Sequence, residues 1–180
     1  MRALYSFLFF KVYKWKFQGN LPEMKKYIII VAPHTSNFDF FVGLAVRSIL
    51  HLKASFLGKA ELFRPPYGWI FRKLGGYPVD RKQHTNLVDA VAAIFDSKDE
   101  FRVAIAPEGT RSYVKQWKSG FYYMALKAKV PIVMVSFDFR DKTVYIGEPF
   151  NPSGNFENDW KKIADFYRPR RGKYEKALPF

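Results

Sequence analysis

Cysteine is absent from the 180-residue sequence. That absence excludes disulfide bonds, thiolate catalysis and cysteine-ligated metal sites, and it fits a reducing compartment. The three histidines, His34, His51 and His84, lack the i, i+4 spacing of helical zinc sites, and the sequence has no G-x-S-x-G motif of a serine hydrolase. We therefore expect no metal site, and neither a metal hydrolase nor a serine hydrolase.

Long apolar runs are also missing. The most apolar stretch near the N-terminus, residues 3–10, is about eight residues long and ends at Lys11, whereas a membrane-spanning helix needs ~20. This stretch is also short for a signal peptide, and no small-residue cleavage site follows it. If the protein meets a membrane, we expect it to lie on the surface.

Acidic residues are few, since 16 Asp and Glu stand against 30 Lys and Arg and the formal net charge is +14. A field of this sign attracts nucleic acid, an anionic membrane leaflet or phosphorylated substrates, and charge alone does not choose among these or a solvated basic surface. No helix-turn-helix, zinc-finger or RNA-binding aromatic signature is present, so we expect no nucleic-acid partner. A basic lipid- or nucleic-acid-binding protein without catalysis is kept as the non-enzymatic alternative.

Hydrophobic residues make up 48% of the chain, enough for the core of one compact domain. Residues 1–18 are especially rich in aromatic residues, with basic residues scattered among them, and they predict a helix that ends near Gly19. Because the lysines do not share one face, the helix is either an interfacial anchor with snorkelling lysines or a helix packed on the domain. We favour an interfacial helix over residues 1–20 and a main domain over residues 21–180.

Apolar patterning along the rest of the chain alternates between strands and helices. Strands are predicted at residues 27–32, 54–57, 77–80, 102–106, 132–137 and 143–146. Helices are predicted at about 36–50, 67–74, 86–95 and 119–128, with another after residue 155, followed by a basic tail. This alternation predicts a single α/β domain with a mostly parallel central sheet flanked by helices. In such sheets, sites form beyond the carboxyl ends of the strands.

His34 directly follows the first buried strand, and Asp39 comes five residues later. Imidazole is well suited to accept a proton near neutral pH, and a carboxylate on its other nitrogen would fix the tautomer and stabilise the imidazolium. The pair is therefore a candidate general base with its orienting partner. The alternative is an S-x-x-D helix start, Ser36 to Asp39, in which Asp39 only caps the helix.

A second polar segment follows the strand at residues 102–106. Its candidate residues are Glu108, Gly109, Thr110 and Arg111. A glycine permits close approach of the backbone to a ligand, and an arginine can bind a phosphate or carboxylate through two hydrogen bonds. The alternative is a polar surface turn in which Glu108 pairs with Arg111.

Two further segments, residues 58–61 and 75–81, are ordinary loops when each is taken alone. Together and in this order, however, the segments resemble four blocks of the glycerolipid acyltransferase family, typified by bacterial 1-acylglycerol-3-phosphate acyltransferase. The blocks are His34/Asp39, Gly76/Arg81, Glu108/Gly109/Thr110/Arg111 and the apolar strand Val130-Pro131-Ile132. The resemblance covers roughly residues 27–148 and identifies residues 21–180 as the acyltransferase domain.

The resemblance implies transfer of a fatty acyl group from acyl-CoA or acyl-carrier protein to the hydroxyl of a lysophospholipid such as 1-acylglycerol-3-phosphate, with no other cofactor. It makes His34 the general base and Asp39 its orienting partner. The substrate-binding residues that it implies are Lys59, Arg81 and Arg111 for phosphate, with Gly76, Glu108, Gly109 and Thr110 around them. It also implies a cytoplasmic enzyme that is peripheral on anionic lipids at the inner face of the cell membrane.

Three residues depart from the family pattern. Pro33 stands where many members have Asn, Pro78 stands where an aromatic residue is common, and Trp117 lies in the segment after the third block. These departures bear on the acceptor more than on the reaction. An aminolipid, hydroxy-fatty acid or glycolipid acceptor is therefore the alternative.

Overall fold

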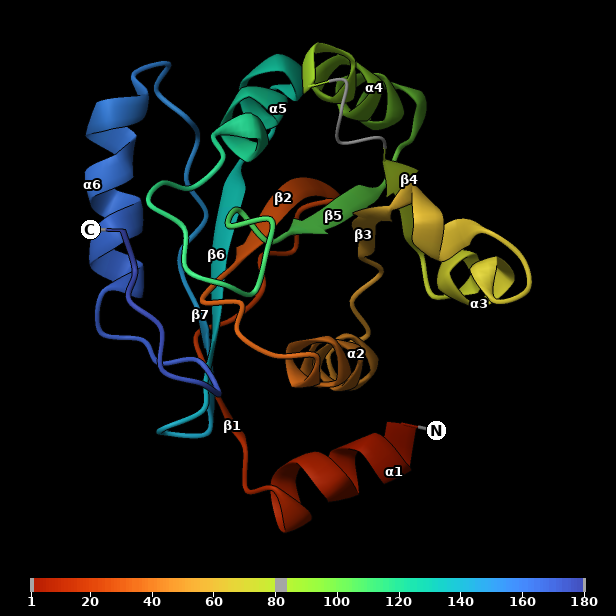
Figure 1. Cartoon of the computed structure of the whole chain (residues 1–180), viewed down its shortest axis with the longest axis vertical. Helices are drawn as coiled ribbons and strands as arrows, with labels where there is room; N and C mark the ends of the chain where they lie inside the picture. The colour runs from red at the N-terminus through yellow and green to blue at the C-terminus, as the bar shows by residue number, and fades with distance from the viewer. Residues whose placement is uncertain (1, 80–83, 180) are drawn as a thin grey trace.

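The computed structural model describes residues 2–79 and 84–179 and arranges the strands among them in one seven-stranded sheet, in the order β1-β7-β6-β2-β5-β3-β4 (Figure 1). The strands are β1 (Lys16–Gln18), β2 (Lys26–Val31), β3 (Ser55–Lys59), β4 (Gly76–Val79), β5 (Phe101–Ile105), β6 (Ile132–Asp138) and β7 (Thr143–Ile146). Neighbouring strands are parallel except for β6 and β7, which are antiparallel. The predicted α/β fold with a mostly parallel sheet is confirmed.

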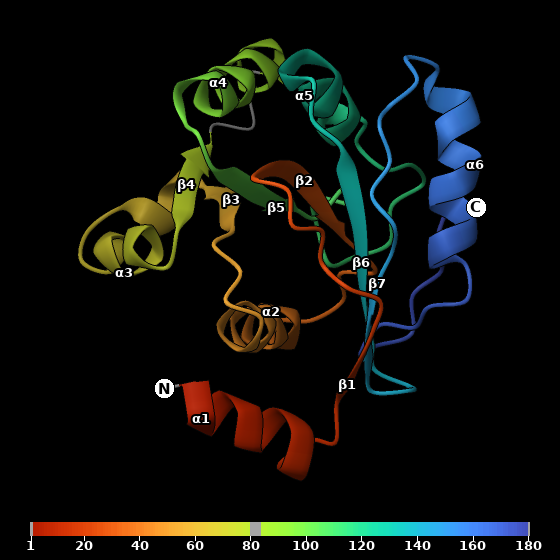
Figure 2. The ribbon, with the colours of Figure 1, turned by 180° about the vertical axis from the view of Figure 1, so that it is seen from behind.

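Helices cover both faces of the sheet (Figures 1 and 2). They are α1 (Arg2–Ser6), the π-helix η1 (Phe7–Val12), α2 (Phe38–Ile49), the 3-10 helix η2 (Ala60–Phe63), α3 (Gly68–Lys73), α4 (His84–Ser97), α5 (Gly120–Ala128) and α6 (Phe156–Tyr167). Helices α4, α5 and α6 pack on one face, and α1, η1 and α2 pack on the other. Within the described residues, no helix is both long and apolar enough to cross a bilayer.

Side chains of the central strand β2 alternate between the two faces of the sheet. In β2, Ile28 and Ile30 belong to the core under α4, α5 and α6, whereas Ile29 belongs to the core under α2. A continuous β-branched run is buried on both faces in this way because helices cover both sides of a parallel sheet. The neighbouring strand β6 is likewise buried along its whole length. These central strands form a rigid base for the loops at their carboxyl ends.

The N-terminal helix is shorter than predicted. It ends at Val12 and does not continue to Gly19, and Lys16–Gln18 instead form β1, which pairs in parallel with β7. The pairing satisfies backbone groups that the edge of β7 would otherwise leave open. Phe9 is 4% exposed, whereas Phe7 and Phe10 are 58% and 42% exposed. The segment therefore packs on the domain along one side and presents aromatic rings along the other.

Smaller differences concern the ends of elements. The strand predicted at 54–57 continues to Lys59, and the helix predicted at 86–95 extends from His84 to Ser97. The last part of the strand predicted at 77–80 lies outside the described residues. Because β2, β5 and β3 are adjacent and parallel, the segments that follow them meet at one edge of the sheet.

Candidate active site

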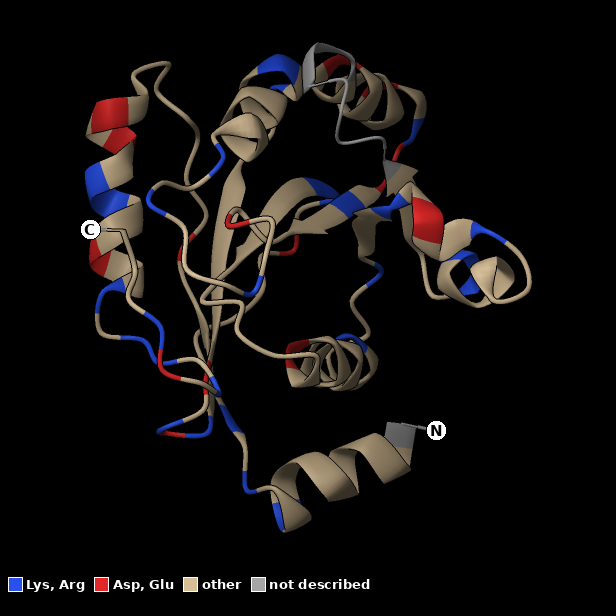
Figure 3. Cartoon of the chain, viewed as in Figure 1, with Lys and Arg blue, Asp and Glu red and all other residues tan. Residues whose placement is uncertain are grey.

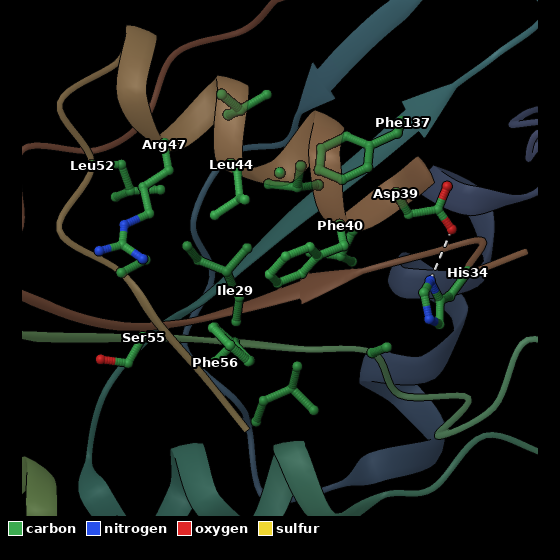
Figure 4. A pocket seen from close by; sticks show the side chains of 18 of the residues that line it. Ile29, His34, Asp39, Phe40, Leu44, Arg47, Leu52, Ser55, Phe56 and Phe137 are labelled. Atoms are coloured by element: carbon green, nitrogen blue, oxygen red, sulfur yellow. Dashed lines mark hydrogen bonds and ion pairs between the residues drawn. The ribbon is translucent and has the colours of Figure 1, made fainter. Parts of the chain in front are cut away.

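His34 and Asp39 lie side by side where β2 gives way to α2. Nδ1 of His34 is 2.8 Å from Oδ2 of Asp39, and Figure 4 shows the two side chains at one end of a cavity. Asp39 is buried, with 5% of its surface exposed, whereas the side chain of His34 is 30% exposed. A carboxylate can only accept hydrogen bonds, so Nδ1 is the donor, and in the neutral ring the lone pair is then at Nε2. The imidazole is thus set to accept a proton at Nε2.

Asp39 also organises the loop that carries His34. The same oxygen, Oδ2, accepts hydrogen bonds from the backbone N–H groups of Thr35 (2.9 Å) and Ser36 (3.0 Å). The other oxygen, Oδ1, is buried and has no hydrogen-bond partner among the described residues. Asn37, the residue before α2, makes no side-chain cap. The capping alternative therefore holds in part, because one oxygen fixes both the loop and the imidazole.

Glu108 is hydrogen-bonded to the main chain of His34. It is 2% exposed, and its Oε1 accepts a hydrogen bond of 2.8 Å from the backbone N–H of His34. Its Oε2 pairs with Nζ of Lys176, a residue of the C-terminal tail. The alternative pairing of Glu108 with Arg111 is therefore wrong. Glu108 acts on the site by holding the main chain of His34.

The rest of the Glu108–Arg111 segment borders the same loop. Gly109 has φ +68, a left-handed conformation that favours glycine, and the exposed guanidinium of Arg111 donates a hydrogen bond to Oδ1 of Asn37. Thr110 is exposed, and its Oγ1 accepts from the N–H of Ser112 at 3.3 Å. Arg111 has five N–H donors, so this contact leaves others for an anionic ligand.

The remaining predicted residues are more distant in the sheet. Lys59 is exposed at the carboxyl end of β3, two strands from β2 and at the same edge as His34. Gly76 begins β4, and a Cβ atom there would come within 2.8 Å of the rings of Phe56 and Phe63. That packing explains the glycine without a ligand, and a substrate contact at Gly76 stays a prediction. Arg81 lies outside the described residues.

An apolar cavity of about 250 Å³ lies between α2 and the sheet. Figure 4 shows that it extends from His34 and Asp39 at one end to Arg47, Leu52 and Ser55 at the other. Between these ends, the apolar side chains that line it include Ile29, Phe40, Leu44, Phe56 and Phe137. Sequence reasoning missed this cavity. The signal available was Gly43, which stands inside α2 and also lines the cavity, since glycine is costly in a helix.

Comparison with known families shows to which family the chain belongs. The sequence model of the family described as Acyltransferase matches residues 14–138. This chain belongs to the acyltransferase family. The matched region contains the His34–Asp39 pair and the whole Glu108–Arg111 segment.

Several curated relatives share this region. The chain is 31% identical over 116 residues to "Probable 1-acyl-sn-glycerol-3-phosphate acyltransferase 5" of Arabidopsis thaliana, a match that covers 60% of the chain and 31% of the relative. It is 28% identical over 113 residues to the 1-acyl-sn-glycerol-3-phosphate acyltransferase of Escherichia coli, covering 59% and 45%. The chain thus spans less than half of the length of these two relatives.

A solved structure supports the fold. The crystal structure of the 1-acyl-sn-glycerophosphate (LPA) acyltransferase PlsC from Thermotoga maritima superposes with a TM-score of 0.57 and 19% sequence identity, covering 96% of this chain and 80% of that one. The similarity establishes a shared architecture.

Proposed function

We propose that the chain transfers a fatty acyl group from a thioester donor, acyl-CoA or acyl-carrier protein, to the hydroxyl of a lysophospholipid such as 1-acylglycerol-3-phosphate. The observation that carries the proposal is the His34–Asp39 pair at one end of an apolar cavity. The imidazole supplies the base that a hydroxyl nucleophile needs. The apolar lining suits an acyl chain, since each buried methylene contributes ~0.8 kcal/mol.

In the proposed reaction, Nε2 of His34 accepts the proton of the acceptor hydroxyl as the hydroxyl oxygen attacks the thioester carbonyl carbon. The C–S bond then breaks, and the departing sulfur takes the proton back from the imidazolium, so the products are an ester and a free thiol. Asp39 stabilises the imidazolium between these steps. Direct transfer needs no acyl-enzyme, in keeping with a sequence that contains no cysteine.

Positive side chains at the same edge of the sheet would bind the anionic group of the acceptor or the donor. Arg111 is the best placed, because its guanidinium is exposed and touches Asn37 in the loop that carries His34. Lys59 lies at the carboxyl end of β3, two strands from β2. Figure 3 shows further Lys and Arg residues in the C-terminal tail, which passes close to this loop.

The protein would meet its lipid substrates at an anionic membrane surface, as a cytoplasmic enzyme on the inner face of the cell membrane. Large apolar side chains are exposed on α1 and η1, on the first turn of α2, and on η2 and α3. They are Leu4, Phe7, Phe10, Val12, Phe38, Phe41, Leu62, Trp69 and Ile70. Exposed apolar groups on a chain of net charge +14 suit a negatively charged lipid surface. Helix α1 packs on α2, the helix that covers the cavity. The exposed side chains of α1, η1 and the first turn of α2 therefore lie on or next to that helix.

The test is a transfer assay with labelled acyl-CoA and acyl-acyl-carrier protein. The acceptors are 1-acylglycerol-3-phosphate, an aminolipid, a hydroxy-fatty acid and a glycolipid, and each product is read by mass. We expect transfer to 1-acylglycerol-3-phosphate, with His34→Ala slowing it about 10²–10⁴-fold, the usual contribution of general acid–base catalysis. His51→Asn is the matched control, because His51 is exposed and does not line the cavity, and Asn tolerates its φ of +52. Equal rates for His34→Ala and wild type would refute His34 as the general base. Preferred transfer to another acceptor would refute 1-acylglycerol-3-phosphate as the substrate.

A further inference from the structure

The C-terminal tail passes along the carboxyl ends of β6 and β2 to the loop that carries His34. It is first held by Asp138, whose Oδ2 accepts a hydrogen bond of 3.0 Å from the backbone N–H of Arg171. Gly172 then lies so close to Thr35 that a Cβ atom there would come within 2.4 Å of the threonine side chain. Two residues later, the N–H of Tyr174 donates to Oγ1 of Thr35 at 3.3 Å. The predicted basic tail is therefore docked on the active-site loop.

The tail brings the side chain of Lys176 into the interior of the protein. Its side chain is 5% exposed, and Nζ donates both to Oε2 of Glu108 and, at 3.1 Å, to the backbone oxygen of His34. Burial lowers the pKa of Lys176, while the nearby Asp39 carboxylate opposes that shift. A buried ion pair is costly unless hydrogen bonds satisfy both partners, and here each partner also bonds to His34.

The two contacts are complementary. Glu108 accepts from the backbone N–H of His34, and Lys176 donates to the backbone C=O of the same residue. Together with the contact between Asp39 and the ring, the bonds fix His34 at its amide, its carbonyl and its imidazole. The histidine that the proposed reaction uses as a base is thereby held in one position relative to the cavity.

We propose that Lys176 is a positioning residue for acyl transfer, which holds the main chain of His34 through the docked tail and through Glu108. The inference rests on the proposed function. Lys176 does not touch the reacting atoms, so its loss leaves the base chemically intact but misplaced. A displacement of about 1 Å at a catalytic group lowers turnover about 10²-fold.

The charge-balanced variant Glu108→Gln/Lys176→Met tests the proposal without leaving a buried charge unpaired. The Gln side chain still offers an oxygen to the N–H of His34, so this variant removes the bond to the His34 carbonyl and the ion pair alone. We expect the kcat of the double variant to fall about 10²-fold. We also expect the KM values for donor and acceptor to stay within about twofold of wild type, because Arg111 and Lys59, the proposed anion-binding residues, are unchanged. We expect Lys176→Met alone to have a lower melting temperature than the double variant. Lys161→Met, which changes an exposed lysine of α6, is the matched control and should match wild type.

Gly172→Ala tests the docking of the tail without changing any charge. The added methyl group would collide with Thr35 and displace the tail, so kcat should fall while Lys176 is still present. Gly120→Ala is the control, since a Cβ at Gly120 meets only Met124 at 3.8 Å. If the wild type is active and kcat is unchanged in both the double variant and Gly172→Ala, the inference about Lys176 is overturned. The proposed function would not be affected by that result. A wild type that transfers no acyl group to any acceptor would overturn the proposed function and this inference with it.

Discussion

Oδ2 of Asp39 accepts a hydrogen bond from Nδ1 of His34 at 2.8 Å, and the same oxygen accepts two more from the backbone of the loop between them. The ring and the loop are therefore fixed at a single atom. One consequence is that a substitution of Asp39 that removes this acceptor changes both the orientation of the His34 ring and the shape of the loop. Substitutions that keep an acceptor at that point separate the two effects.

Asp39→Asn should retain the fold and lose part of the activity. The Asn oxygen can take the place of Oδ2, where the Thr35 and Ser36 N–H groups hold it, and the amide nitrogen then takes the place of Oδ1, which has no partner among the described residues. Only the negative charge that stabilises the imidazolium is lost, on the scale of a charged hydrogen bond, ~1.5–3 kcal/mol or about 10–150-fold in kcat.

Asp39→Ala is the comparison, because it also removes the acceptor that holds the loop. It should lower both kcat and the melting temperature, and steady-state kinetics with thermal unfolding of the two variants measures the difference. If Asp39→Asn and Asp39→Ala lose the same activity and the same stability, the division between charge and acceptor is wrong.

The central strands and the His34–Asp39 pair were predictable because their patterns are local. A continuous β-branched run such as residues 28–31 indicates a strand buried on both faces, and a histidine just after it falls at the edge where parallel sheets form sites. Spacing alone left the role of Asp39 open between cap and catalytic partner. The structure explains why, since one oxygen serves both.

Contacts between distant segments were not predictable. Lys176 reaches the backbone of His34 across 142 residues, and a lysine in a basic tail carries no periodicity that marks it as buried. Strand β1 has only three residues and pairs with β7, so its aromatic neighbours suggested a longer helix instead. A contact of Glu108 with the acceptor stays a prediction, whereas its partners within the chain, the main chain of His34 and Lys176, were not foreseen.

Arg111→Ala should weaken the binding of an anionic acceptor. The exposed guanidinium borders the loop of His34 and has donors to spare, so its loss should cost ~1.5–3 kcal/mol, about 10–150-fold in KM for a phosphorylated acceptor. Lys115→Ala changes an exposed basic residue of the same connection and should have little effect. An equal rise in KM for a neutral acceptor would argue against a phosphate contact at Arg111.

The two sides of η1 should respond differently to substitution. Phe7→Ser/Phe10→Ser changes exposed rings, so binding to anionic vesicles should weaken about tenfold or more while the melting temperature stays near wild type. Phe9→Ala empties a buried site against Trp15 and Phe17 and should cost ~3–5 kcal/mol of stability. Vesicle co-sedimentation and thermal unfolding measure these outcomes. Unchanged vesicle binding in the double variant would assign membrane contact to another surface.

Gly43 should control the length of the acyl chain that the cavity accepts. A Cβ atom at this position lies 3.8 Å from the ring of Phe137, an ordinary contact, so Gly43→Ala should fold normally and gain up to ~1 kcal/mol in helix propensity. A larger side chain has to occupy the cavity that Gly43 lines. Gly43→Leu should therefore shift the preferred donor to shorter acyl chains, while Gly43→Ala changes it little. Competition among donors of different chain length, read by product mass, measures the shift, and a folded Gly43→Leu with the wild-type distribution would mean that the chain lies elsewhere.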